Sequence, residues 1–160
     1  MLIDDLYRAM EWSDARMWTA VRRVNADSLR EKIYHLHMVQ RAFLSVWRGT
    51  PERPPQLDSF PDTPAIEHWA RGYYPEAHAF IATLDDAAMK RPIVLQWAAR
   101  ITEIAEPGVP TLEQTLMQVV LYTTHHRGQI VSRIRELGAH PPLTDYIAWI
   151  WLGRPAAQWD

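Results

Sequence analysis

The chain has 160 residues and a formal net charge of −2, a length that suits one domain with its own core, so we treat residues 1–160 as a single domain. It contains no cysteine, which excludes disulfides, thiolate metal sites and a cysteine nucleophile. Acidic and basic residues are interspersed, so the sequence predicts neither nucleic-acid nor membrane binding. The first residues, MLIDDLYRAMEW, lack the basic start and apolar run of a signal peptide, and we expect a cytoplasmic protein.

Hydrophobic periodicity predicts helices in the first half of the chain. The first is expected over residues 2–25, and the second begins at a cap, Asp27 or Ser28, and runs to about residue 48. The next stretch, TPERPPQLDSFPD, predicts a loop, because successive prolines deny a helix its backbone donors. A third helix is expected over residues 62–84 with a kink at Pro75.

The second half contains the longest predicted helix. Residues 91–106 are rich in β-branched side chains and predict either a short hairpin or an irregular connection. A capping box from Thr111 to Gln114 begins the fourth main helix, and Gly138 ends it. A short last helix follows in DYIAWIWLG. The fold class is therefore all-α: a four-helix bundle with a long third-to-fourth helix connection and a short C-terminal helix.

One side of the fourth main helix carries an unusual polar stripe. Helical spacing places these residues along it: Gln118, Tyr122, His126, Gln129 and Arg133. A solvated face usually carries Lys and Glu, whereas this one offers a phenol and an imidazole. Gly128 lies beside the stripe, and glycine inside a helix costs about 1 kcal/mol relative to alanine. We therefore expect a neighbouring helix or a ligand to approach closely there.

His35, in the middle of the second helix, is the expected partner of this stripe. If the bundle buries it opposite Tyr122 and His126, two imidazoles and a phenol converge. Neutral imidazole is a common ligand of zinc, nickel and iron, and three ligands on two helices leave the open position of a catalytic site. The alternative is that these histidines are ordinary core or boundary residues. The remaining histidines are interpreted as structural or surface residues: His37, His68, His78, His125 and His140.

Three segments together resemble a known family. The run THHRGQI, followed by RIRELGAHPPLTDYIAWIWLGRP, is similar to the end of proteins of the DinB-like (DinB/YfiT) superfamily. HLHMVQRAFLSVWRG and YRAMEWSDARMW resemble that family's second and first helices, and the likeness is weakest between about residues 50 and 110. The resemblance implies a four-helix bundle that holds a divalent metal with three histidines, one in the second helix and an H-x-x-x-H pair in the fourth.

This sequence departs from the implied pattern at one ligand position. His35 and His126 match two of the histidines, but the middle position is Tyr122. The free pKa of tyrosine is near 10, so a bound ion would have to drive its deprotonation. Three outcomes stay open. The site binds a divalent metal more weakly, it binds a different metal such as ferric iron, or it binds no metal and Tyr122 forms a hydrogen bond with His35 or His126.

Two functional hypotheses follow from the resemblance. The superfamily includes thiol-dependent transferases and isomerases that use a metal to activate a low-molecular-weight thiol. The first hypothesis is a metal-dependent enzyme, thiol-S-transferase-like or hydrolase-like, in which His35 and His126 are metal ligands and Tyr122 is a ligand or an acid beside the ligands. Gln129 then contacts either the small-molecule substrate or the metal ligands. The second is a non-catalytic small-ligand-binding or stress-associated bundle that has lost its metal. The Trp-rich composition and the resemblance both suggest a homodimer.

Overall fold

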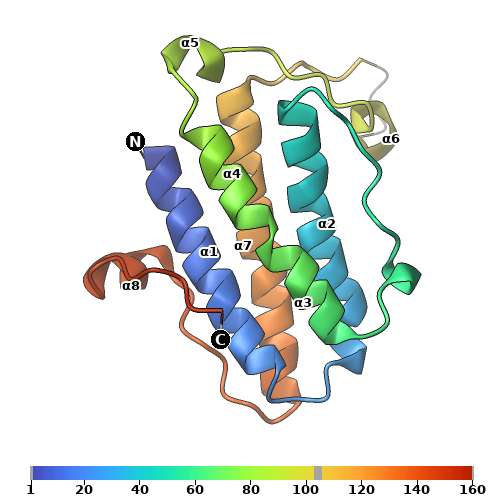
Figure 1. Ribbon diagram of the computed structural model, residues 1–160, viewed down its shortest axis with the longest axis vertical. Helices are drawn as coiled ribbons and strands as arrows, with labels where there is room; N and C mark the ends of the chain where they lie inside the picture. The colour runs from blue at the N-terminus through green and yellow to red at the C-terminus, as the bar shows by residue number, and fades with distance from the viewer. Residues whose placement is uncertain (1, 103–105, 160) are drawn as a thin grey trace.

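The computed structural model describes residues 2–102 and 106–159, and the long regular elements in them are helices (Figure 1). The expectation of an all-helical fold is confirmed. The α-helices are α1 (Leu2–Val21), α2 (Arg30–Trp47), α3 (Thr63–Arg71), α4 (Tyr73–Ile81), α5 (Asp86–Met89), α6 (Ala98–Thr102), α7 (Leu112–Glu136) and α8 (Tyr146–Trp151). None of the helices in the described ranges combines the length and the apolar character needed to cross a membrane.

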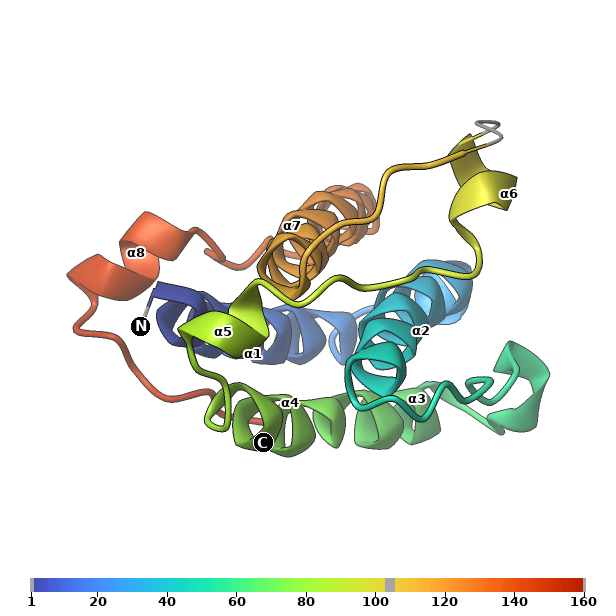
Figure 2. The same ribbon diagram turned by 90° about the horizontal axis from the view of Figure 1, so that it is seen from above.

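The long helix α7 is the centre of the arrangement. Both α1 and α2 pack along it, and the α3–α4 segment lies against α1 and α2 on the side away from α7 (Figures 1 and 2). The short helix α8 packs on the outside of α1 (Figure 2). In the described part of the chain, no further helix covers the outer side of the α2–α7 interface at the level of the polar stripe.

The third predicted helix is two helices, so the expected count of four main helices is not confirmed. α3 ends at Arg71, Gly72 follows, and α4 starts at Tyr73. Pro75 lies in the first turn of α4, where its missing N–H costs nothing, whereas further along a helix its ring would clash with the carbonyl four residues earlier. The predicted kink at Pro75 is thus a break one turn earlier.

The connection between α4 and α7 is irregular. It contains α5 and α6, and just after α5 it pairs with the residue that precedes α7 through an isolated bridge, Pro92 with Thr111. Ile93 N donates to Pro110 O at 2.8 Å, and Leu112 N donates to Arg91 O at 2.8 Å. Of the two alternatives for residues 91–106, the described part fits the irregular connection; residues 103–105 lie outside the described residues.

The helix ends test the predicted caps. At the start of α7 the capping box is present: Thr111 Oγ1 accepts from Gln114 N at 3.3 Å, and Gln114 Oε1 accepts from Thr111 N at 2.9 Å. Gly138 follows the end of α7 with φ of 87°, a backbone conformation that favours glycine. The predicted side-chain cap of the second helix is wrong, because a 3₁₀ turn, Asp27–Leu29, precedes α2 and no side chain caps it.

A buried polar layer divides the core into two apolar clusters. One cluster surrounds Tyr7, Trp47 and Leu116, and the other surrounds Trp18, Ile33 and Ile130. Between them, on α1, α2, α4 and α7, lie the residues of the buried polar layer: Asp14, His37, Gln40, Tyr74, Thr123 and Arg127. Such a layer is stable only when every polar group has a partner.

Candidate functional site

His35, Tyr122 and His126 come together at the interface of α2 and α7, and we call them the His–Tyr cluster. The Tyr122 hydroxyl and His35 Nε2 are hydrogen-bonded to each other. The ring centroids of His35 and His126 are 5.2 Å apart, and those of Tyr122 and His126 are 4.1 Å apart. The two α7 residues are one turn apart, so both rings lie on the side of α7 that faces His35.

The cluster lies at the edge of the bundle. His35 is exposed, and Tyr122 and His126 are half-buried. The expectation that His35 is buried is therefore wrong. The reason is helical geometry: His37 is two residues on, about 200° around the helix, and it is the His37 ring that enters the core.

An open cleft of about 500 Å³ adjoins the cluster. It is lined by Ser28, Glu31, Lys32, Tyr34, His35, Gln56, Leu57, His126 and Gln129. Gln56 and Leu57 come from the proline-rich loop, which thus forms one wall. This volume is within the range of about 300–1,000 Å³ that is typical of small-molecule sites.

The rest of the polar stripe has different roles. Gln129 lines the cleft and donates through Nε2 to His125 Nε2 at 3.0 Å. Gln118 is exposed, and Arg133 forms an exposed ion pair with Glu136 at 2.7 Å. A Cβ at Gly128 would meet no heavy atom within 4 Å, so the expected close approach of a neighbouring helix is wrong.

The protonation states in the cluster follow from partial burial. Burial, with His35 and His125 as neighbours, lowers the pKa of His126, so its imidazole is neutral near neutral pH. Burial raises the pKa of Tyr122 above the usual 10, so its phenol keeps its proton. The hydrogen bond with Tyr122 engages His35 Nε2 whichever of the two atoms donates.

These donors do not fit the three-histidine metal site that the resemblance implies. Within residues 2–102 and 106–159, no three His, Cys, Asp or Glu side chains converge as a metal site would require. The cluster offers two imidazoles, and the third group is a phenol with a raised pKa. Zinc prefers nitrogen, sulfur or carboxylate donors, and binding Tyr122 would require loss of a tightly held proton.

Comparison with known protein families places the chain. A family model described as the DinB family matches residues 4–159. The chain belongs to the DinB family. Searches of curated proteins and of solved structures each return no significant match. The family match spans α1 to α8 and therefore includes both the His–Tyr cluster and the buried polar layer.

In this DinB-family chain, the buried polar layer is centred on an ion pair that joins α1 to α7. Asp14 Oδ1 accepts from Arg127 Nη1 at 2.7 Å. Asp14 Oδ2 accepts from Gln40 Nε2 at 3.1 Å and from the Tyr74 hydroxyl. Gln40 Nε2 also donates to Thr123 Oγ1 at 3.2 Å, so α2 is joined to the same network.

The hydrogen bonds of His37 determine its tautomer. Trp18 Nε1 can only donate, and it lies 3.0 Å from His37 Nε2, which must therefore accept. The proton is then on Nδ1, which donates to Gln40 Oε1 at 2.8 Å. Burial lowers the pKa of His37, in agreement with this neutral ring.

Sequence reasoning missed this layer, although the sequence carries a signal for it. Asp14 lies four residues from both Met10 and Trp18, so a carboxylate interrupts the apolar face of α1. Arg127 lies four residues after Thr123 in the same way on α7. Opposite charges on the apolar faces of two helices predict a buried pair. Since Thr123 and Arg127 each directly follow a cluster residue, the layer holds the backbone behind Tyr122 and His126.

Proposed function

We propose that the cleft at the His–Tyr cluster binds a small polar molecule, and that the metal site implied by the family is degenerate in this chain. The proposal rests mainly on the hydrogen bond between the Tyr122 hydroxyl and His35 Nε2. A metal ion bound to His35 Nε2 would have to break that hydrogen bond. The Tyr122 phenol, whose pKa is raised by burial, would have to lose its proton to become a ligand.

The residues that line the cleft indicate which class of ligand would bind there. Lys32 and Glu31 supply one charge of each sign, and Gln56 and Gln129 supply amide donors and acceptors. The neutral His126 imidazole adds a further donor and acceptor. A ligand with several polar groups of both kinds suits this lining, and low-molecular-weight thiols that carry amide and carboxylate groups belong to that class.

A metal-dependent transferase or hydrolase is the second candidate, and one observation favours it. The rings of His35 and His126 come from two helices, lie 5.2 Å apart and border an open cleft. Two neutral imidazoles can hold zinc, nickel or iron when water completes the coordination. Such a centre would be weaker than one with three imidazoles.

Metal titration of three proteins separates the two candidates. Calorimetry with Zn²⁺ and Ni²⁺ would compare wild type with Tyr122→His and Tyr122→Phe. We expect Tyr122→His to bind more than about 100-fold more tightly than wild type, since loss of an outer-shell partner alone costs about 10–100-fold. Equal affinity in wild type and Tyr122→His, with loss of binding in Tyr122→Phe, would overturn the degenerate-site proposal and identify the phenolate as a ligand.

Ligand binding is tested on chelator-treated protein with glutathione as the probe. Histidine NMR signals report on the cleft, and we expect the His126 resonances to shift on addition of glutathione. The matched control is His140→Asn, which lies outside this cleft and should leave the shifts unchanged. Shifts that occur only after Zn²⁺ is added would contradict the proposal and favour the metal-dependent enzyme. Cytoplasmic location and a homodimer stay predictions, and light scattering tests the latter.

A further inference from the structure

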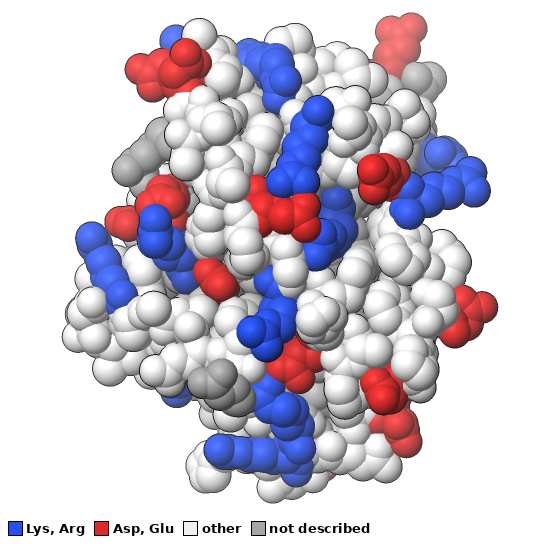
Figure 3. Space-filling model, in the orientation of Figure 1, with Lys and Arg blue, Asp and Glu red and all other residues white. Residues whose placement is uncertain are grey.

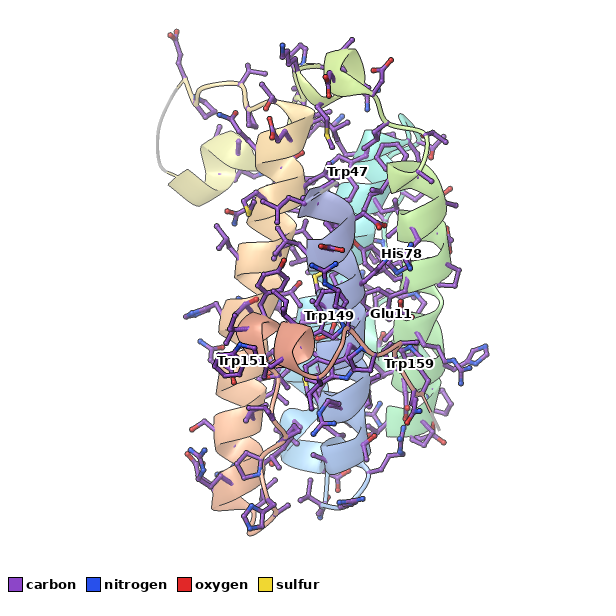
Figure 4. All side chains as sticks on the ribbon, turned by 90° about the vertical axis from the view of Figure 1, so that its left-hand side faces the viewer. Glu11, Trp47, His78, Trp149, Trp151 and Trp159 are labelled. Carbon is purple, nitrogen blue, oxygen red and sulfur yellow. The ribbon has the colours of Figure 1, made fainter. Side chains whose placement is uncertain are left out.

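A second cleft lies on the opposite side of α1 from the core. Its volume is about 600 Å³, and it is formed between α1 and the chain segments that follow α7 and α8. The segment after α8 runs along the outside of α1 toward α3 and α4 (Figures 2 and 4). No residue of the His–Tyr cluster lines it. We call it the arginine cleft.

The charged residues that line the arginine cleft are basic. Arg16 lies on α1, Arg23 lies in the turn that follows α1, and His140 lies on the facing segment. Neither Asp nor Glu is among its lining residues in the described ranges. This differs from the general surface, where acidic and basic side chains are interspersed on the face shown in Figure 3. The cleft therefore offers positive charge without an internal counter-charge.

The two arginines have free hydrogen-bonding capacity. Arg16 Nε donates to Leu143 O at 2.9 Å, and its guanidinium lies 5.0 Å from the centre of the Trp12 ring, which holds the side chain in place. Its Nη atoms have no hydrogen-bond partner in the described residues. The Arg23 side chain is exposed, and within the described ranges it likewise has no hydrogen-bond or ion-pair partner. Guanidinium groups with unused donors bind carboxylates in a bidentate way.

The wall facing α1 is apolar and held in position. Pro141, Pro142 and Pro155 contribute rigid apolar surface to it. Ser13 Oγ donates to Thr144 O at 3.0 Å, and Trp149 Nε1 donates to Pro155 O at 3.0 Å. The two segments that form the wall are thus fixed by hydrogen bonds, and little ordering is needed on binding.

We propose that the arginine cleft binds a small-molecule carboxylate with a compact apolar body. The carboxylate pairs with Arg16 and Arg23, and the apolar body packs against the three prolines. The volume fits a small ligand. This proposal is independent of the proposed function, because the two clefts have no lining residue in common.

Calorimetry with benzoate, and with benzamide as a neutral analogue of the same shape, tests the proposal. We expect wild type to bind benzoate and not benzamide, and Arg23→Gln to weaken benzoate binding about tenfold, as expected when a charged hydrogen bond is lost. Arg16→Gln should have a similar effect, but it also removes the bond to Leu143, so Arg23→Gln is the decisive variant. Arg135→Gln, an exposed arginine on α7, is the matched control and should bind like wild type.

Three outcomes would overturn the proposal. The first is equal binding of benzoate and benzamide, which would show that the charge has no role. The second is unchanged benzoate affinity in Arg23→Gln with a wild-type thermal midpoint. The third is inorganic phosphate binding as tightly as benzoate and with the same dependence on Arg23, which would show only a general anion patch.

Discussion

Arg127 Nη1 and Asp14 Oδ1 are 2.7 Å apart in the buried polar layer, where their side chains are 5% and 0% exposed. The pair links α7 to α1 across the centre of the core, between the two apolar clusters. Because the register of α7 is specified at Arg127, the face on which Tyr122 and His126 lie is specified with it. A buried pair of this kind can select one arrangement of helices even where it adds little net stability.

Breaking this pair should be strongly destabilising. Asp14→Asn leaves the Arg127 charge buried without a counter-charge, and we expect the free energy of unfolding to fall by about 3–5 kcal/mol. Arg8→Gln is the control, because its ion pair with Asp4 is exposed and should contribute less than about 1 kcal/mol. Urea unfolding followed by circular dichroism measures both. A loss below about 1 kcal/mol in Asp14→Asn would show that the layer is hydrated or the pair is not formed.

His37 should make the protein less stable in mild acid. Burial lowers its pKa below the usual 6.5 in the folded state, so below about pH 6.5 the unfolded chain binds the proton more readily. The stabilisation that the neutral His37 ring contributes is therefore fully present above about pH 7.5 and is lost as the pH falls. The free energy of unfolding then decreases by at most about 1.4 kcal/mol per pH unit. Around the ring, Asp14 favours the charged form, whereas Arg41 and Arg127 disfavour it.

The pH experiment needs variants, because His126 also has a lowered pKa and contributes with the same sign. Unfolding free energies between about pH 5 and 7.5 would be compared for wild type, His37→Gln and His126→Asn. We expect His37→Gln to reduce the slope more than His126→Asn, since His37 is fully buried and His126 only partly. An unchanged slope in His37→Gln would mean that the ring is protonated, or hydrated, in the folded state.

The accuracy of sequence-based prediction differed between elements for physical reasons. The limits of α7 were predicted within one residue at each end, because its capping box and its terminal glycine are local signals. The break at Gly72 was missed because Pro75 was treated as a kink inside a helix, whereas proline is better accommodated in a helix's first turn. The gathering of His35, Tyr122 and His126 was predicted from helical spacing and the family motif.

The buried polar layer was harder to predict from the sequence. Asp14 and Arg127 are separated by 113 positions, and the sequence alone does not show that the helix faces that carry them pack against each other. Only the packing of α1 against α7 turns the two charges into a satisfied pair. Similarly, His35 is exposed because none of the helices in residues 2–102 and 106–159 covers the outer edge of α2 and α7, and hydrophobic periodicity does not predict this.

Tyr122 should titrate above the usual tyrosine pKa of 10, because burial disfavours its phenolate. The ultraviolet absorbance of phenolate, measured as the difference between wild type and Tyr122→Phe, isolates this side chain. We expect no phenolate from Tyr122 at about pH 8–9, with or without saturating Zn²⁺. Appearance of the phenolate band on addition of Zn²⁺ at neutral pH would show that the metal deprotonates Tyr122 and would restore it as a ligand.

The last tryptophan, Trp159, should stabilise the fold, whereas Trp151 should not. Trp159 packs against both apolar clusters and donates through Nε1 to Glu11 Oε1 at 3.1 Å, next to the hydrogen bond between Glu11 Oε2 and His78 Nε2 (Figure 4). Trp151, in contrast, is 78% exposed on α8. Truncation of a fully buried tryptophan costs about 3–5 kcal/mol, so we expect about 2 kcal/mol for Trp159→Ala, whose ring is half-buried.

Thermal unfolding of Trp159→Ala and Trp151→Ala tests this contrast with the same substitution at two sites. For a chain of this length, a loss of about 2 kcal/mol lowers Tm by about 4–8 °C. Trp151→Ala should stay within about 0.5 kcal/mol of wild type, as exposed substitutions usually do. Glu11→Gln separates the two hydrogen bonds of Glu11, because it replaces the carboxylate oxygen that faces His78 but keeps an acceptor for Trp159 Nε1. Equal Tm values for the two alanine variants would mean that the segment after α8 is not packed against α1 in solution.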